Sequence, residues 1–169
     1  MASGLRGGSR FQSQFIAKPT RESLELVSAT GSRWVPYYRT FYTGYKQMVL
    51  RADELVARIR LPRRSERWVQ YYRKVGTRKA QAISKVCFAA AARLEGGRIA
   101  EVRIAVGSVA PTVVRCDQTE EVLTSDRGAV DTARAAFTSE IAPIDDIRST
   151  ANYRLRVAAN LLEDFLQIL

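Results

Sequence analysis

The sequence predicts an α+β protein, in which a small antiparallel sheet packs with a C-terminal helical bundle. Three observations lead to this fold class. The first two thirds of the chain contain short stretches with the two-residue alternation of strands, and Gly-containing turns separate several of them. The last third changes to apolar intervals of three and four, the period of amphipathic helices. Strands followed by helices in sequence order are typical of this class.

The first predicted strands form a hairpin and a third, separate strand. Residues 23–29 (SLELVSA) and 32–36 (SRWVP) are short β-type runs, and we expect a tight turn at Thr30 and Gly31 between them. Residues 54–62 (ELVARIRLP) alternate until a proline ends the pattern. The charged, Pro-led segment 62–67 (PRRSER) then predicts a boundary between two parts of the chain.

Three further elements predict the main sheet. Residues 68–75 (WVQYYRKV) and 98–111 (RIAEVRIAVGSVAP) have the composition of strands. Residues 84–94 (SKVCFAAAARL) fit either a buried strand or a helix, because their run of alanines suits both. A turn at residues 95–98 (EGGR) joins the last two elements.

Helical patterns occupy the C-terminal third. Asp117 and Glu120 resemble a capping box ahead of a short helix. Two sets of apolar residues mark the buried faces of two later helices: Val130, Ala133, Phe137 and Ile141 in one, and Leu155, Ala158, Leu162, Phe165 and Leu169 in the other. Ser149 or Thr150 is the expected N-cap of the last helix, and Asp145 and Asp146 before it suit a turn and cap better than paired catalytic carboxylates.

Composition excludes several classes of site. The 169 residues contain no histidine, which removes Ser-His triads and most zinc sites. The only cysteines, Cys87 and Cys116, have apolar neighbours and are expected to be buried structural thiols, which fits a reducing cytoplasm. No apolar run approaches the ~20 residues of a membrane span, so no membrane association is expected.

A basic run between Arg67 and Arg93 raises the main functional question. It holds seven cations and no Asp or Glu, in a chain with 27 Lys and Arg against 17 Asp and Glu and a net charge of +10. From the residues alone, three explanations remain open: a solvated charged face, a nucleic-acid surface with interleaved aromatic rings, or one wall of a pocket for the pyrophosphate or flavin of a cofactor.

Four blocks of sequence carry a resemblance that ranks these explanations. They are residues 41–62, 73–86, 98–115 and 141–162, in this order. Together they resemble the C-terminal half of the FAD-binding medium subunit of xanthine dehydrogenase and carbon monoxide dehydrogenase type molybdenum hydroxylases.

The resemblance implies a flavoprotein subunit that passes electrons from iron–sulfur clusters through FAD to an acceptor. The implied partners are a large subunit with the molybdenum cofactor and a small iron–sulfur subunit; nucleic acid is not an expected partner. Because the flavin does the redox chemistry, the protein would bind, orient and tune it.

The resemblance also implies five cofactor-binding positions. Lys74 and Arg78 match basic residues on the flavin side of the C-terminal domain, with Gly76 between them keeping the strand edge open. Val56 matches an apolar residue against the flavin, and Gln81 stands where some relatives carry an acidic residue near the isoalloxazine. No catalytic or metal-binding residue is implied in this chain.

The N-terminus departs from the family, which begins with a long flavin domain. We therefore expect residues 1–23 to be an unassigned leader, residues 24–62 a remnant of the FAD-binding domain, and residues 66–169 a domain like the C-terminal domain of CO dehydrogenase flavoproteins. Such a chain is expected to bind FAD weakly or not at all on its own and to be inactive alone. Two alternatives stay open: a basic module that binds nucleic acid or an acidic partner, and an inactive remnant.

Overall fold

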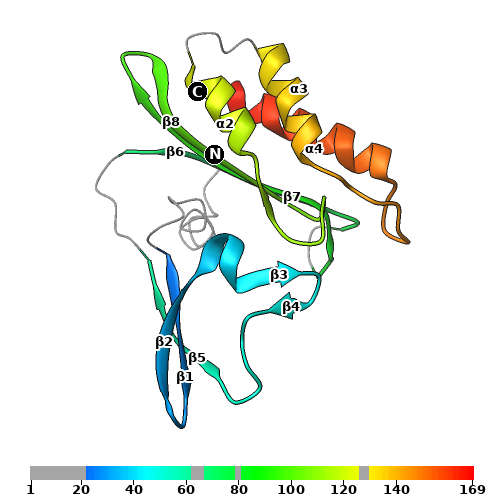
Figure 1. Cartoon of the computed structure of the whole chain (residues 1–169). Helices are drawn as coiled ribbons and strands as arrows, with labels where there is room; N and C mark the ends of the chain where they lie inside the picture. The colour runs from blue at the N-terminus through cyan, green and yellow to red at the C-terminus, as the bar shows by residue number, and fades with distance from the viewer. Residues whose placement is uncertain (1–21, 62–66, 79–80, 126–129) are drawn as a thin grey trace, which may run out of the picture. The chain divides into compact units, whose positions relative to one another are not determined.

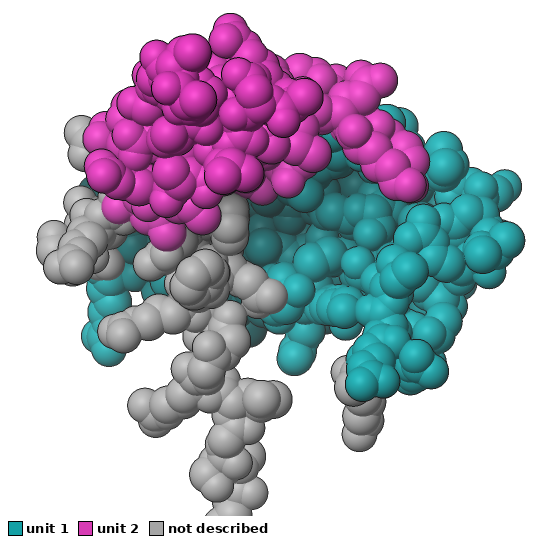
Figure 2. Space-filling model, turned by 90° about the horizontal axis from the view of Figure 1, so that it is seen from below, with its two compact units in different colours: residues 1–16, 66–169 teal, residues 17–65 magenta. Residues whose placement is uncertain are grey.

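The structure is a computed structural model in which the chain forms two compact units, shown in Figure 2 and described separately below. The residues it describes are 22–61, 67–78, 81–125 and 130–169. Most of the predicted leader and of the boundary segment 62–67 therefore lies outside the described residues.

Unit 2 contains the predicted hairpin and third strand. Its antiparallel sheet has the order β2-β1-β5, with β1 at Ser23–Ser28, β2 at Gly31–Pro36 and β5 at Leu55–Arg60. Ser28 pairs with Gly31, so the turn residues are Ala29 and Thr30, one position earlier than expected. The sequence pattern therefore predicted these strands correctly. It placed the turn between β1 and β2 one residue too late.

The core of unit 2 is small, and one of its strands is uncovered. An irregular turn η2 (Tyr37–Phe41) and a short hairpin of β3 (Tyr42–Gly44) and β4 (Gln47–Met48) lie between β2 and β5. The buried residues are Leu24, Leu26, Val35 and Phe41. All six residues of β5 are exposed, including Leu55 at 75% and Ile59 at 58%.

A clamp of charged side chains closes the loop that precedes β5. The Arg33 guanidinium donates to both oxygens of the buried Glu54 carboxylate at 2.6 and 2.8 Å, and to the Val49 carbonyl at 2.8 Å. The Arg51 amide donates to the same carboxylate at 2.9 Å. The hydrogen bonds from Arg33 and then from Arg51 lower the pKa of Glu54 to about 2.

Unit 1 is built on a four-stranded antiparallel sheet. Its order is β6-β7-β8-β9, with β6 at Val69–Gly76, β7 at Ser84–Glu95, β8 at Arg98–Gly107 and β9 at Val114–Arg115. The ambiguous segment is a strand, because it pairs with a neighbour on both sides and every second residue from Val86 to Ala92 is buried in the core. Gly96 and Gly97 form the tight turn to β8 at φ of 58° and 78°, a conformation that glycine adopts without strain.

Three helices form a layer on one face of this sheet (Figure 1). They are α2 at Asp117–Thr124, α3 at Val130–Glu140 and α4 at Ala151–Leu166. The α+β fold class is therefore confirmed. Phe88 lies at the centre of the core, with ring centroids of Tyr71, Phe137 and Phe165 at 5.9, 6.0 and 6.4 Å.

The two predicted helix starts have different outcomes. Thr150 caps α4, because its hydroxyl accepts from the Tyr153 amide at 3.2 Å. The capping box at α2 is wrong: Cys116 is the N-cap and makes no side-chain cap bond. The Glu140 carboxylate, from the end of α3, instead accepts from the amides at positions 118 and 119 at 2.9 Å each. A carboxylate distant in sequence replaced the local one, which the sequence pattern could not show.

Candidate functional site

The sheet face opposite the helices in unit 1 forms a strip of small side chains. Strand alternation places Val86, Phe88, Ala90 and Ala92 in the helix-covered core, so the intervening residues of β7 point the other way. The strip is made of the half-buried Cys87, Ala89, Ala105 and Gly107, with the buried Ala91 at one end. Tyr72 borders it on β6, where its hydroxyl accepts from the Cys87 thiol at 3.3 Å. Side chains this short leave a flat surface.

Lys74 stands beside this strip. It is directly opposite Cys87 in the register of β6 and β7, and its side chain is exposed. Among the described residues, no carboxylate forms an ion pair with its ammonium group. The charge of Lys74 is therefore available to a ligand.

The end of β6 and the connection to β7 bring three more of the expected positions together. Gly76 packs so closely that a Cβ atom there would lie 3.3 Å from the Ala82 Cβ. The Arg78 guanidinium donates to the Gln81 carbonyl at 3.2 and 2.7 Å, and Gln81 has a φ of 49°. The Arg78 side chain thus holds the backbone of the β6–β7 connection in place through the Gln81 carbonyl. Gln81 itself has the left-handed backbone conformation that this tight connection needs.

Val56, the fifth expected position, belongs to unit 2. It lies on the uncovered strand β5 and is 42% exposed. Lys74, Gly76, Arg78 and Gln81 are thus grouped at one end of β6 in unit 1, and Val56 belongs to the other unit. The flavin-binding role of all five residues stays a prediction.

The basic run around these residues mostly contacts the chain itself. The Arg73 guanidinium carbon lies 5.7 Å from the centroid of the Tyr71 ring, and the Lys85 Nζ lies 5.1 Å from that of Tyr153. Arg93 is paired with carboxylates. Lys79 lies outside the described residues. Arg73, Lys85 and Arg93 thus contact other side chains of the chain, while Arg67, Arg73, Lys74 and Arg78 are exposed.

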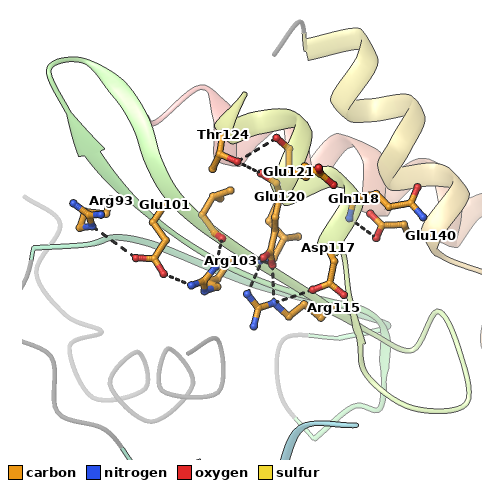
Figure 3. Close-up of polar contacts among 12 residues, drawn as sticks. Arg93, Glu101, Arg103, Arg115, Asp117, Gln118, Glu120, Glu121, Thr124 and Glu140 are labelled. Carbon is orange, nitrogen blue, oxygen red and sulfur yellow. Dashed lines mark hydrogen bonds and ion pairs between the residues drawn. The ribbon is translucent and has the colours of Figure 1, made fainter. Parts of the chain in front are cut away.

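An ion-pair ladder crosses the sheet from β7 to the start of α2, as Figure 3 shows. Its members, in order, are Arg93, Glu101, Arg103, Glu120, Arg115 and Asp117. Glu120 is its most connected member: it accepts from Arg115 at 2.9 and 2.8 Å and from the Ile104 amide at 2.8 Å. Three arginines face three carboxylates, so the ladder is electrically balanced.

Sequence reasoning missed this ladder because it treated Glu120 as a cap. The available signal was the alternation of Glu101 and Arg103 on one face of a predicted strand.

Among the described residues, no three Cys, Asp or Glu side chains gather in a way that could hold a metal ion. Within the same residues, no helix is long and apolar enough to cross a membrane.

Comparison with known proteins gives consistent results. The family model of the CO dehydrogenase flavoprotein C-terminal domain matches residues 70–169, more than half of the chain. The xanthine dehydrogenase FAD-binding subunit of Escherichia coli O157:H7 is 31% identical over 138 residues, which is 79% of this chain and 47% of the relative. The carbon monoxide dehydrogenase medium chain of Hydrogenophaga pseudoflava is 26% identical over 141 residues, 82% of this chain and 48% of the relative.

Solved structures show the same relationship. A carbon monoxide dehydrogenase chain from Hydrogenophaga pseudoflava matches with a TM-score of 0.77 at 27% identity, covering 88% of this chain and 52% of that one. Reconstituted CO dehydrogenase from Oligotropha carboxidovorans matches with a TM-score of 0.78 at 26% identity, covering 92% and 54%. The chain thus spans about half the length of the curated relatives it matches. On this evidence the chain belongs to the CO dehydrogenase flavoprotein C-terminal domain family.

Proposed function

We propose that the chain acts in the flavoprotein subunit of a xanthine dehydrogenase type molybdenum hydroxylase, where electrons pass from iron–sulfur clusters through FAD to an acceptor. Its family membership supports this proposal, as do relatives named FAD-binding subunit and CO dehydrogenase medium chain. The molybdenum cofactor and the iron–sulfur clusters would lie in a large and a small partner subunit. A cytoplasmic location is part of the proposal, and the two free thiols suit a reducing compartment.

The observation that carries the proposal is the exposed Lys74 beside a flat strip of small residues. The isoalloxazine of FAD is planar, and its pyrophosphate is anionic, so a flat surface with an uncompensated cation suits this cofactor. FAD, when bound, supplies the redox chemistry. Lys74 would contribute a charge-assisted contact, and Gly76 would let the β6–β7 connection pack closely beside it.

The remaining expected positions would shape this wall of the site. Arg78 holds the β6–β7 connection through the Gln81 carbonyl, so we assign it to positioning as well as to charge. Val56 would add an apolar contact from the segment 24–62, which we propose to be part of an FAD-binding domain. Residues 66–169 would be the C-terminal domain of the subunit.

A titration with FAD tests the proposal. Flavin fluorescence of the full chain should show weak but saturable binding, and Lys74→Gln should weaken it further by about 5- to 150-fold, since a charge-assisted contact contributes roughly 1–3 kcal/mol. Arg156→Gln is the control, because Arg156 is exposed on α4, in the helix layer. Absence of saturable binding would reject the flavin role for this chain. Equal affinities of the two variants would reject the assignment of Lys74.

A further inference from the structure

Two serines link neighbouring strands of unit 1 beyond the last backbone pair between them. Backbone pairing of β7 with β8 begins at Cys87 and Gly107. Ser84 is the first residue of β7, and Ser108 directly follows β8. The hydroxyl oxygens of these two serines are 3.2 Å apart, so one hydroxyl donates to the other. The serine pair, Ser84 and Ser108, therefore extends the link between β7 and β8 to the level of Gly76, which is opposite Ser84 in the register of β6 and β7.

Ser108 has a backbone conformation that serine rarely adopts. Its φ is 67°, in the left-handed region where residues other than glycine are uncommon and carry backbone strain. Such residues persist only where the surrounding structure holds them in place, and they cluster at functional sites. Glycine would adopt this conformation without strain, but it would lack the hydroxyl that reaches Ser84. The serine at this position therefore indicates a role for the hydroxyl contact.

A buried arginine holds the backbone of Ser108 in place. Arg154, on the first turn of α4, is 2% exposed, and its guanidinium donates to the Ser108 carbonyl at 2.8 Å and to the Asp146 carboxylate at 2.5 Å. The carbonyl of the buried Val109 accepts from the Ala142 amide at 3.1 Å. These contacts tie the segment after β8 to α4 and to the connection before α4. A buried ion pair is weak evidence for added stability, so the clear effect of this one is positional.

Ser84 connects this fixed segment to the candidate flavin site. It begins β7 directly after the β6–β7 connection and lies opposite Gly76. A Cβ atom on Gly76 would lie 3.3 Å from the Ala82 Cβ and 3.6 Å from the Ile83 carbonyl oxygen, so the end of the connection packs directly against Gly76. Lys74 is on the same strand, close to Gly76. A displacement of Ser84 would therefore move the backbone around Gly76 and change the wall beside Lys74.

We propose that Ser84, Ser108 and Arg154 are positioning residues that keep the β6–β7 connection in the ordered conformation able to bind FAD. This inference rests on the proposed function, which names FAD as the ligand of this wall. In this role the three residues act through the backbone of the connection. When only part of the molecules have the binding-competent conformation, the apparent affinity falls in proportion to that part. Loss of the hydroxyl contact should therefore weaken FAD binding without removing any group that contacts FAD.

Titration of the full chain with FAD, followed by flavin fluorescence, tests the proposal. Ser84→Ala should weaken the affinity by about 2- to 12-fold, the range that one lost hydrogen bond accounts for. Ser84→Thr should bind FAD as the wild type does, because threonine keeps the hydroxyl. Ser84→Ala combined with Ser108→Ala should bind FAD as weakly as Ser84→Ala alone, since both substitutions remove the same bond. Ser139→Ala is the matched control: it removes an exposed hydroxyl that donates to the Ala136 carbonyl at 2.7 Å on α3, and it should change the affinity less than about twofold.

A second measurement reads the order of the connection in the absence of FAD. In NMR relaxation of the free chain, the amide order parameters of Gln81, Ala82 and Ile83 should be near the rigid value of about 0.85 in the wild type and fall below about 0.6 in Ser84→Ala, while that of Phe88 in the core stays unchanged.

The two measurements separate the possible failures. Unchanged order parameters in Ser84→Ala would overturn the inference, and so would a wild-type FAD affinity in this variant. A loss of order throughout β7 would show a structural role only and would also overturn it. Absence of FAD binding by the wild type would reject the flavin role; order parameters that fall in Ser84→Ala would then still support the positioning of the connection by the serine pair.

Discussion

Replacing Glu120 by alanine should be among the most damaging single substitutions in unit 1. Glu120 is 7% exposed, and its carboxylate accepts three hydrogen bonds, two from Arg115 and one from the Ile104 amide. These contacts join α2 to β8 and β9, and Arg103 lies a further 3.6 Å away. Removing the carboxylate therefore leaves Arg115 without its main counter-charge, and it takes away one of the two carboxylates beside Arg103.

The expected cost follows from two contributions. Breaking a buried ion pair by removing one partner typically destabilises by about 3–5 kcal/mol, because the remaining charge is buried and uncompensated. An unsatisfied buried amide, here that of Ile104, costs about 1–3 kcal/mol. Both arise from one carboxylate and overlap, so we expect about 3–5 kcal/mol in total. A domain is stable by only about 5–15 kcal/mol, so the variant should be close to unfolding at room temperature.

Urea unfolding followed by circular dichroism measures this cost. Glu121→Ala is the matched control, because Glu121 is the exposed neighbour on the same helix and should change stability by less than about 0.5 kcal/mol. In a double-mutant cycle, Glu120→Ala and Arg115→Met should be non-additive by about 1–3 kcal/mol. A loss below about 1 kcal/mol in Glu120→Ala, or additive effects in the cycle, would refute the view that the ladder is structural.

Two other predictions concern protonation and thiol chemistry. The pKa of Glu54 falls from 4.5 to about 2 on folding, so its stabilising effect on unit 2 is complete above pH 4.5 and is lost as the pH falls towards 2. Glu54→Gln should flatten this pH dependence of stability, measured by Trp34 fluorescence in a Trp68→Phe background. A steep acid transition in the variant would contradict this prediction. Burial raises the pKa of the Cys116 thiol, so Ellman's reagent should modify half-buried Cys87 in the native protein and Cys116 only after unfolding. Equal rates of modification at the two thiols would show that Cys116 is accessible.

The fold was predictable where its cause is local. Apolar alternation identified the strands, and intervals of three and four identified the buried Ala133 and Phe137 of α3 and the buried face of α4. Val130 was wrongly expected on the buried face of α3, because at the first position of the helix it is 52% exposed. The segment containing Phe88 stayed ambiguous because alanines suit both strand and helix, and only pairing with neighbours on both sides decides between them. The cap on Thr150 was correct because it involves a residue three positions away.

The sequence was less informative where a contact joins distant residues. Glu120 matched a capping box, yet its carboxylate is held by Arg115 and the Ile104 amide, and Glu140 caps α2 instead. Asp146 was correctly expected in a turn, but its bond to buried Arg154 depends on the packing of α4 against the end of β8. For the candidate site, the sequence supplied the positions around Lys74, whereas only the strand register shows the small side chains beside it.

The uncovered strand β5 also affects how the protein behaves in concentrated solution. Among the described residues it is one of the two outer strands of its sheet, with exposed Leu55 and Ile59 next to Arg58 and Arg60. A free strand edge can pair with the same edge of another molecule and start aggregation, and charged side chains on such an edge oppose this by repulsion. Salt screens that repulsion. The strand β5, which contributes least to the core, would therefore set the highest ionic strength at which the chain remains monodisperse.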